Sequence, residues 1–569
     1  MKKNYIITPL FVLFFFSFHA NSQNLVWARQ MGGTGNGIGN SLCLDASGNI
    51  YTTGYFSGTT DFDPGSGTFN LTSAGTDDIF ISKLDPLGNF LWTKQIGGAD
   101  YQRSFSIAVN ANGEIYTTGF FYGTTDFDPG TGTYNMIASG ATQDIFISKL
   151  DASGNFVWAK QMGDAGYEIG NSITLDISGD VYVTGKFSGT VDFDPGNGVF
   201  NMTSTVGSSD DDIFILKLDA SGNFQFAKRM GGLDRDEGLS IAVDANKNIY
   251  TTGYFKAGTD FDPGAGNYYI SIVDKTDIFV SKLDAAGDFV WAKAMAGTGD
   301  EQANAIFVDA VGNVYTTGLF ERTVDFDPGA GTFDLTVDSV TDVFVSKLDA
   351  SGNLVWAKKL GGSDDEAAFS IAVDAAGNVY TTGNFAGTAD FDPGSGIYNL
   401  TATNYNDAFI SKLDASGNFI WAEQIGGGPS QLANSIVTDA GGTVFITGNF
   451  NGTTDFDPGS GIYNVVSIGP LNNVYVVKLS AATGIIESDN YSENITFFPN
   501  PAANRLYINS EKQFQNIIIK DLTGRIIYKE TVNKNSVDID VHHFHEGEYF
   551  VNLLFDAGSE TRRICIIRE

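Results

Sequence analysis

The chain has 569 residues, of which 67 are acidic and 33 basic, so its formal net charge is −34. An acidic excess this large excludes nucleic acid and anionic membrane surfaces as partners, because both attract positive charge. Glycine is abundant at 68 residues, aromatic residues make up 13%, and only two cysteines are present. This composition favours many short strands joined by glycine turns and excludes a disulfide framework.

The first 22 residues have the pattern of an export signal. Lys2 and Lys3 precede a mostly apolar stretch over residues 5–18, and the small residues Ala20 and Ser22 stand before a cleavage site at Gln23. This is the arrangement of a secretory signal peptide, and the apolar run is shorter than the roughly 20 residues that a membrane span needs. The sequence therefore predicts a signal peptide over residues 1–22 and no transmembrane segment in the mature chain.

A repeat of about 65 residues fills the middle of the chain. Its most constant part is the pentapeptide Asp-Phe-Asp-Pro-Gly, which begins at Asp61, Asp126, Asp192, Asp260, Asp325, Asp390 and Asp455. The first repeat is expected to form strands over residues 41–45, 50–56, 79–85 and 90–96, with tight turns after the first and third strands. Residues 57–78, between the second and third strands, are expected to form a small hairpin.

Four antiparallel strands repeated seven times are typical of an all-β, seven-bladed β-propeller. Residues 24–33 read as a fourth strand with no repeat before it, and the last repeat lacks its own fourth strand. We therefore expect the N-terminal strand to complete the last blade over the region 23–487, which leaves no unpaired edge. A regular tryptophan in the fourth strand, as at Trp92, is expected to pack between blades.

These repeats resemble the SBBP family, whose seven-bladed repeats occur in exported bacterial proteins, over about residues 24–487. The tight turns fall on one face, and the hairpins and the connectors between blades on the other. The connectors differ most between repeats, so this hairpin and connector face is where a specific protein or glycan ligand is expected. Neutral drift of the connector loops is the alternative.

Residues 495–569 have a different composition and follow a polar linker over residues 488–494. Strand-like runs over residues 506–508, 516–521, 524–528, 537–541, 549–555 and 563–567 predict a small β-sandwich. The region resembles the C-terminal sorting domain of the type IX secretion system of Bacteroidetes. The matching residues are Phe498, Pro499, Asn500, Pro501, Gly524, Gly547 and Tyr549. The resemblance implies that the type IX machinery handles residues 495–569 and delivers the chain across both membranes to the cell surface or the extracellular space.

The aspartates of the repeated pentapeptide are candidate calcium ligands, because calcium prefers six to eight hard oxygen ligands. Two aspartates per hairpin and one at the start of the third strand would supply some of them. The candidates are Asp61, Asp63, Asp78, Asp126, Asp128, Asp144, Asp192, Asp194, Asp212, Asp260, Asp262, Asp277, Asp325, Asp327, Asp342, Asp390, Asp392, Asp407, Asp455 and Asp457. The favoured alternative is a structural hairpin in which Asp63 caps the Pro-Gly turn and Phe62 packs near Phe69.

The connectors contain acidic clusters that would suit glycoside hydrolysis, which needs two carboxylates across a sugar. These are Asp234, Asp236 and Glu237 in one connector and Asp364, Asp365 and Glu366 in another. Catalysis by histidine is excluded in the repeats, since none occurs between residues 24 and 493. The favoured hypothesis is a non-enzymatic binding, adhesion or scaffold protein with no firm cofactor; a carbohydrate-active hydrolase is the alternative.

Overall fold

The computed structural model describes residues 23–480, except 165, 208–209, 257, 271–274 and 460, and residues 496–566, except 499–501, 503, 522–524, 546 and 556–557. The chain divides into two compact units, Met1–Ala481 and Ala482–Glu569. The predicted signal peptide and linker lie outside the described residues. Every helix or strand element in the described ranges is a β-strand, and no helix there is long and apolar enough to cross a membrane.

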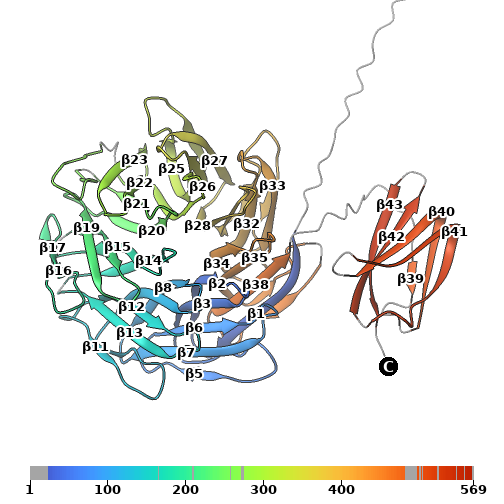
Figure 1. The fold of residues 1–569 in the computed structure, drawn as a ribbon. Helices are drawn as coiled ribbons and strands as arrows, with labels where there is room; N and C mark the ends of the chain where they lie inside the picture. The colour runs from blue at the N-terminus through green and yellow to red at the C-terminus, as the bar shows by residue number, and fades with distance from the viewer. Residues whose placement is uncertain are drawn as a thin grey trace, which may run out of the picture. The chain divides into compact units, whose positions relative to one another are not determined.

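The strands of the first unit pair into successive antiparallel sets of four (Figure 1). The first three sets are β2 (Gly37–Leu44), β3 (Ile50–Phe56), β6 (Asp78–Leu84) and β7 (Phe90–Gly98); β8 (Gln102–Val109), β9 (Ile115–Phe121), β12 (Asp144–Leu150) and β13 (Phe156–Met162); and β14 (Ile169–Leu175), β15 (Val181–Phe187), β18 (Asp212–Leu218) and β19 (Phe224–Met230). The next three are β20 (Glu237–Val243), β21 (Ile249–Phe255), β22 (Asp277–Leu283) and β23 (Phe289–Gly297); β24 (Gln302–Val308), β25 (Val314–Asp325), β26 (Asp334–Leu348) and β27 (Leu354–Gly362); and β28 (Glu366–Val373), β29 (Val379–Phe385), β32 (Asp407–Leu413) and β33 (Phe419–Ile425).

The last set joins the two ends of the repeated region. It consists of β34 (Ser430–Thr438), β35 (Val444–Asn451), β38 (Asn473–Ser480) and β1 (Asn24–Gly33), in that order. Asn24 pairs with Ser480 and Met31 with Val474, which is the pairing expected from the sequence. The first strands of successive sets contact one another in a closed cycle, from β2 through β8, β14, β20, β24, β28 and β34 back to β2.

Serine hydroxyls link these first strands. The Ser41 hydroxyl accepts the backbone N–H of Ile107 at 3.4 Å, and the Ser435 hydroxyl accepts that of Leu42 at 3.2 Å, which connects the last set to the first. Each serine follows a register shift in its strand, as between Gly39 and Ser41. A β-bulge of this kind turns a side chain out of the regular alternation, so the hydroxyl reaches the neighbouring set.

Short hairpins project between the second and third strands of the sets, as expected from the sequence. Their strands are β4 (Thr59–Asp61) with β5 (Asn70–Thr72), β10 (Thr124–Asp126) with β11 (Asn135–Ile137), β16 (Thr190–Asp192) with β17 (Asn201–Thr203), β30 (Thr388–Asp390) with β31 (Asn399–Thr401), and β36 (Thr453–Asp455) with β37 (Asn464–Val466). In the fifth set the hairpin is formed by β25 and β26 themselves, whose pairing shifts register between Glu321 and Thr323.

The repeated tryptophans pack between neighbouring sets. A Cβ placed on Gly154, in the turn between β12 and β13, would lie 3.3 Å from the ring of Trp92 in β7. Gly154 has a φ of 77°, so both its backbone conformation and the adjacent ring favour glycine there. Trp92 also makes an edge contact with Tyr51, at 6.3 Å between ring centroids. These contacts confirm the packing role expected for the tryptophans.

The second unit consists of β39 (Thr496–Phe498), β40 (Arg505–Asp521), β41 (Ile526–Asp540), β42 (Gly547–Phe555) and β43 (Gly558–Ile566), paired into one sheet. The predicted division of residues 505–521 and 526–540 into two short strands each was wrong, because each range forms one strand. The polar stretch after Asn509 interrupts the apolar alternation, but the pairing continues through a register shift between Asn509 and Phe514.

Candidate binding clefts between neighbouring repeats

The aspartates of each Asp-Phe-Asp-Pro-Gly hairpin bind their own backbone. Asp61 Oδ1 accepts the N–H groups of Asp63 at 3.0 Å and Phe69 at 2.8 Å, and Asp63 Oδ1 accepts that of Gly65 at 2.8 Å. The same pattern recurs at Asp126 and Asp128, Asp192 and Asp194, Asp260 and Asp262, Asp325 and Asp327, Asp390 and Asp392, and Asp455 and Asp457. These bonds fix the hairpin conformation, as expected of an aspartate that caps a turn.

Six of the seven hairpins pair with the set that precedes them, whereas β16 and β17 form a two-stranded sheet of their own. Asp126 of β10 pairs with Gly97 of β7, and Asp390 of β30 pairs with Gly361 of β27. Single bridges join Gly231 to Asp260 and Gly426 to Asp455 in the same way. These six hairpins therefore link neighbouring sets through the backbone, a role that the sequence analysis missed.

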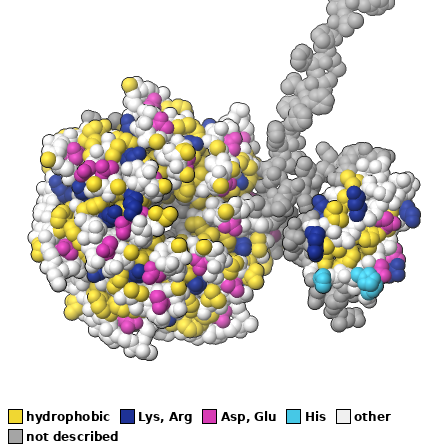
Figure 2. Space-filling view, in the orientation of Figure 1, with side chains coloured by type: hydrophobic (Ala, Val, Ile, Leu, Met, Phe, Trp, Pro, Cys, Tyr) yellow, Lys and Arg dark blue, Asp and Glu magenta, His cyan; other side chains and the backbone are white. Residues whose placement is uncertain are grey.

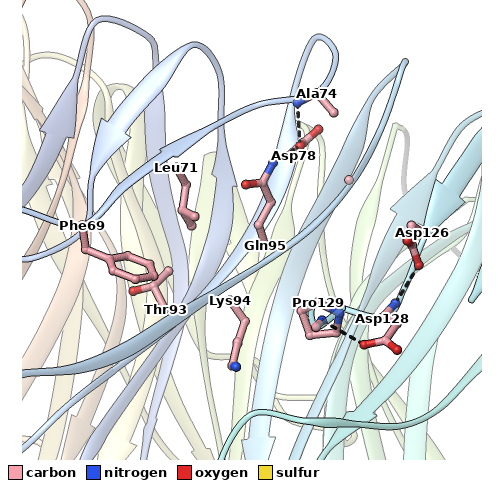
Figure 3. A pocket seen from close by; sticks show the side chains of 12 residues that line it. Phe69, Leu71, Ala74, Asp78, Thr93, Lys94, Gln95, Asp126, Asp128 and Pro129 are labelled. Carbon is pink, nitrogen blue, oxygen red and sulfur yellow. Dashed lines mark hydrogen bonds between the residues drawn. The ribbon is translucent and has the colours of Figure 1, made fainter. Parts of the chain in front are cut away.

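A cleft of about 380 Å³ lies between the first hairpin, the outer strand β7 and the second hairpin. Figure 3 shows Phe69 and Thr93 on one side, and Asp126, Asp128 and Pro129 on the other. Lys94 and Gln95 also line it. The cleft therefore combines an aromatic ring with hydrogen-bond donors and acceptors, which is typical of small-molecule sites.

Asp78 lies at the inner end of this cleft and is completely buried. Its Oδ2 accepts hydrogen bonds from the N–H of Ala74 at 2.8 Å and from Gln95 Nε2 at 2.5 Å. Burial raises the pKa of the Asp78 carboxyl, against the effect of these bonds. The cleft brings Asp78 beside Asp126 and Asp128 of the next repeat, whereas the sequence analysis grouped it with the hairpin of its own repeat.

The other predicted calcium ligands at the start of a third strand are buried as well. Asp144, Asp212, Asp277, Asp342 and Asp407 have no exposed surface. Across the described residues, no group of three or more histidine, cysteine, aspartate or glutamate side chains gathers closely enough to hold a metal ion. Calcium binding stays a prediction, to be tested by experiment.

The hairpin phenylalanines have separate roles. Phe62 is buried against Phe56 and Phe80, with ring centroids 5.1 and 5.0 Å apart. Phe69 is 37% exposed and stacks on Phe90 at 5.1 Å. The expectation that Phe62 packs near Phe69 was wrong for the side chains, although Phe62 donates its N–H to the Phe69 carbonyl.

An aromatic residue occupies the Phe69 position in every repeat, which is a signal the sequence analysis did not use. The set comprises Phe69, Tyr134, Phe200, Tyr268, Phe333, Tyr398 and Tyr463, with exposed fractions from 36% to 44%. Five of them stack on a phenylalanine of the fourth strand, at centroid distances of 4.8 to 5.1 Å. We call these seven residues the rim aromatics.

Three of the six connector acids proposed for hydrolysis, Asp236, Glu237 and Glu366, are buried, whereas Asp234, Asp364 and Asp365 are exposed. Asp236 has no exposed surface and accepts the N–H of Lys256 at 2.9 Å and the Thr259 hydroxyl at 2.7 Å. Glu237 is 9% exposed and forms an ion pair with Lys186 at 3.0 Å. Glu366 is 1% exposed. Buried acids that bind protein groups are not available to a polymeric substrate.

The charged residues at the surface form no single patch on the face shown in Figure 2, where acidic side chains are scattered among basic and apolar ones. The net charge of −34 is therefore spread over many repeats.

In the second unit, three of the predicted sorting residues lie on described strands. Phe498 ends β39, and Gly547 and Tyr549 belong to β42, where they pair with Ile566 and Ile564 of β43. The Tyr549 hydroxyl donates to the His545 carbonyl at 2.8 Å. The predicted residues Pro499, Asn500, Pro501 and Gly524 lie outside the described residues.

Together the strand sets and the hairpins define an all-β protein built from propeller-type repeats. Residues 157–186 match the family described as a beta-propeller repeat, SBBP, and residues 496–567 match the secretion system C-terminal sorting domain. Both matches confirm the resemblances seen in the sequence. The sorting domain marks proteins that type IX secretion exports, so this chain is delivered to the cell surface or the extracellular space.

Two curated proteins are similar to this chain over part of their length. An uncharacterized WD repeat-containing protein, L264, of Acanthamoeba polyphaga mimivirus is 24% identical over 507 residues, covering 75% of this chain and 36% of that protein. The regulatory protein FlaEY of Caulobacter vibrioides is 25% identical over 217 residues, covering 37% of this chain and 20% of that protein. The chain thus spans about a third or less of the length of these relatives.

Among solved structures, Sqt1 from Chaetomium thermophilum matches with a TM-score of 0.37 and 9% identity, covering 81% of this chain and 99% of that one. PorZ, a surface component of the type IX secretion system of Porphyromonas gingivalis, matches with a TM-score of 0.17 and 12% identity, covering 95% of this chain and 100% of that one.

Proposed function

We propose that this chain is an exported, non-enzymatic binding or adhesion protein. Its region 23–487 is a closed seven-bladed β-propeller, and its region 495–569 is a small β-sandwich that acts as the sorting signal. The closed cycle of first strands and the pairing of β1 with β38 support the closed ring. In this assignment each set of four strands is one blade, and the serine bonds between first strands lie around the central axis.

The observation that carries the binding function is the recurrence of one surface feature in every repeat. Each repeat carries a rim aromatic in its acidic hairpin, and Phe69 of the first repeat borders a cleft of about 380 Å³ together with Asp126 and Asp128 of the second. Rigid elements that present exposed rings are suited to recognition, because little conformational freedom is lost on binding. The burial of Asp236 and Glu366 argues against the hydrolase alternative.

The mature exported chain, fluorescently labelled, provides the test. We expect saturable binding to insoluble surface material from the producing cells, with no release of reducing sugar from that material. A Glu237→Gln variant should bind like the native chain. Release of reducing sugar by the native chain and its loss in this variant would instead establish the hydrolase, and absence of binding would contradict the proposal.

A further inference from the structure

We propose that the clefts between neighbouring hairpins bind hexose units of a neutral glycan, with the sugar ring lying against a rim aromatic. This inference rests on the proposed binding function and specifies its ligand. It commits to carbohydrate over protein, and the reasons are the aromatic platform, the polar wall, the charge and the repetition of the site.

The rim aromatic provides a rigid flat surface. Phe69 stacks on Phe90 at 5.1 Å with 39° between the rings, and Tyr134 stacks on Phe156 at 4.8 Å with 35°. One side of each ring is thereby supported, while 37% of Phe69 and 43% of Tyr134 stays exposed. A pyranose has an apolar face of C–H groups, and the negative face of an aromatic ring attracts such weakly positive hydrogens.

The rest of the cleft can bind the hydroxyl groups at the edge of a sugar. Lys94 carries a hydrogen-bond donor, and Asp126 and Asp128 carry carboxylate acceptors, while the amide nitrogen of Gln95 already donates to the Thr72 carbonyl and to Asp78. Figure 3 shows Asp126 and Asp128 across the cleft from Phe69. A sugar hydroxyl both donates and accepts, so a lining that mixes the two kinds of group fits it. The volume of about 380 Å³ admits one or two hexose rings rather than a folded protein segment.

Charge favours a neutral glycan over an acidic one. The chain carries −34, and two hairpin carboxylates line the cleft itself. Uronic acid or sulfated sugars would be repelled by both the local and the overall field. Phosphorylated glycans are disfavoured for the same reason.

Repetition of the site favours a polymer made of like units. The rim aromatic of each repeat is followed by two hairpin aspartates in the next repeat. The residue that would donate hydrogen bonds to the sugar varies between repeats. The positions equivalent to Lys94 are Arg29, Lys160, Lys228, Lys293, Lys358 and Glu423. A folded protein partner has no reason to match a surface repeated seven times, whereas a polysaccharide offers one unit to each cleft. Weak single sites then combine into strong overall binding.

The experiment is affinity electrophoresis of the full exported chain in gels containing dextran, mannan, laminarin or alginate. We expect retardation by at least one of the three neutral polysaccharides and none by alginate. Replacing all seven rim aromatics with leucine keeps an apolar side chain on the supporting phenylalanine but removes the flat ring. This variant should bind at least about tenfold more weakly, whereas Phe69→Leu alone should lose less than about threefold because six rim aromatics remain.

Ile177→Ala is the matched control. Ile177 is 98% exposed in the turn between β14 and β15, at the opposite end of the strands from the hairpins. Its removal should leave binding unchanged, and circular dichroism should show that the leucine variant is folded. Retardation that survives in the folded leucine variant, retardation by alginate alone, or none in any gel would overturn the inference.

Periodate treatment of the cell-surface material separates this inference from the proposed function. Binding that is lost after periodate, which cleaves sugar diols, supports a glycan. Binding that survives periodate but is lost after protease overturns the glycan inference and leaves the binding function in place. Absence of binding to untreated material overturns both.

Discussion

Six of the seven interfaces between neighbouring sets fall into two kinds, distinguished by one buried side chain; the last set carries Asn473 in place of the aspartate. In four interfaces the buried aspartate at the start of a third strand lies near a second acid from the next set, and in two its neighbour is a glutamine. The acid pairs are Asp144 with Glu168, Asp212 with Asp236, Asp277 with Glu301, and Asp342 with Glu366, and the glutamine pairs are Asp78 with Gln102 and Asp407 with Gln431.

The two kinds share their backbone geometry. The N–H of Gln102 donates to the Asp77 carbonyl at 2.9 Å, and the N–H of Glu301 donates to the corresponding carbonyl of Thr276 at 3.0 Å. A glutamine can donate from its amide, whereas a carboxyl can donate only when it holds a proton. Two buried carboxylates side by side cannot both be charged, so the acid interfaces bind a proton that the glutamine interfaces do not need.

The pKa values of the second acids follow from this difference. Burial raises the pKa of Glu168 and of Asp236 to about 8, and it also raises those of Glu301 and Glu366, with Asp277 and Asp342 as the charged neighbours. Four aspartates of the tight turns after the first strands, Asp45, Asp176, Asp309 and Asp374, behave oppositely. Although burial opposes it, hydrogen bonds from Asn49 lower the pKa of Asp45.

The largest expected effect is the dependence of stability on pH. Above about pH 4.5 the unfolded chain loses the protons of the second acids, whereas the folded chain keeps them. Their contribution to the free energy of unfolding is therefore complete below that pH and is lost as the pH rises through 8. We expect the free energy of unfolding to fall by on the order of 5 kcal/mol between pH 5 and pH 9. Urea denaturation at pH 5, 7 and 9 measures it.

The turn aspartates determine how stability changes at low pH. Because the pKa values of Asp45, Asp176, Asp309 and Asp374 are lowered on folding, their contribution is present above the unfolded value near 4 and is lost at lower pH. Stability should therefore be greatest near pH 5. A free energy of unfolding that rises from pH 5 to pH 9 would show that the acid pairs are not protonated.

The next largest expected effect is the loss of stability when the buried Asp342 is displaced. A Cβ on Gly361 would lie 2.2 Å from Asp342 Oδ1, so Gly361→Ala must displace this carboxyl from Glu366. We expect a loss of about 3 kcal/mol, which thermal or urea unfolding measures.

Ala296 is the matched control. It occupies the same position in the fourth set and pairs with Asp325 as Gly361 pairs with Asp390. Ala296→Gly should cost about 1 kcal/mol or less, through backbone entropy alone. Equal losses in the two variants would mean that displacement of the carboxyl contributes nothing.

Exchanging the distinguishing side chain converts one kind of interface into the other. Gln102→Glu should make stability more dependent on pH, because it adds an acid beside Asp78, and Glu366→Gln should make it less dependent. We expect each exchange to change the difference in unfolding free energy between pH 5 and pH 9 by about 1 to 2 kcal/mol, in opposite directions. Changes of the same sign would contradict the comparison.

The smallest expected effect is that of calcium. In each hairpin, one oxygen of both aspartates already accepts backbone N–H groups, as in Asp61 and Asp63. We therefore expect Tm to change by about 1 °C or less when EDTA is added to the calcium-treated chain. A large fall in Tm, with bound calcium found by elemental analysis, would instead establish the hairpins as metal sites.

The strands and the packing of the tryptophans between sets were predictable from the sequence, whereas the contacts that the hairpins and the connector acids make with neighbouring repeats were not. The four strands, the hairpins and the pairing of residues 24–33 with the last set follow from periodicity and turn residues. Periodicity cannot tell which hairpin approaches Asp78, because an identical hairpin exists in both repeats. The connector acids were candidates for hydrolysis, and acids are seldom fully buried, yet Glu366 is 1% exposed, since a neighbouring carboxyl can share its proton.

The pairing of β1 with β38 also determines how the ring would carry mechanical load. Any pull transmitted through the residues after Ser480 enters β38, which is bonded to β35 on one side and to β1 on the other. The load is therefore spread over two ladders of hydrogen bonds. Asn24 and Ser480 lie at the same end of their pair, so a pull applied between the two termini of the ring would instead open these bonds one at a time. The molecule should resist force from its C-terminal side far better than force that separates its ends.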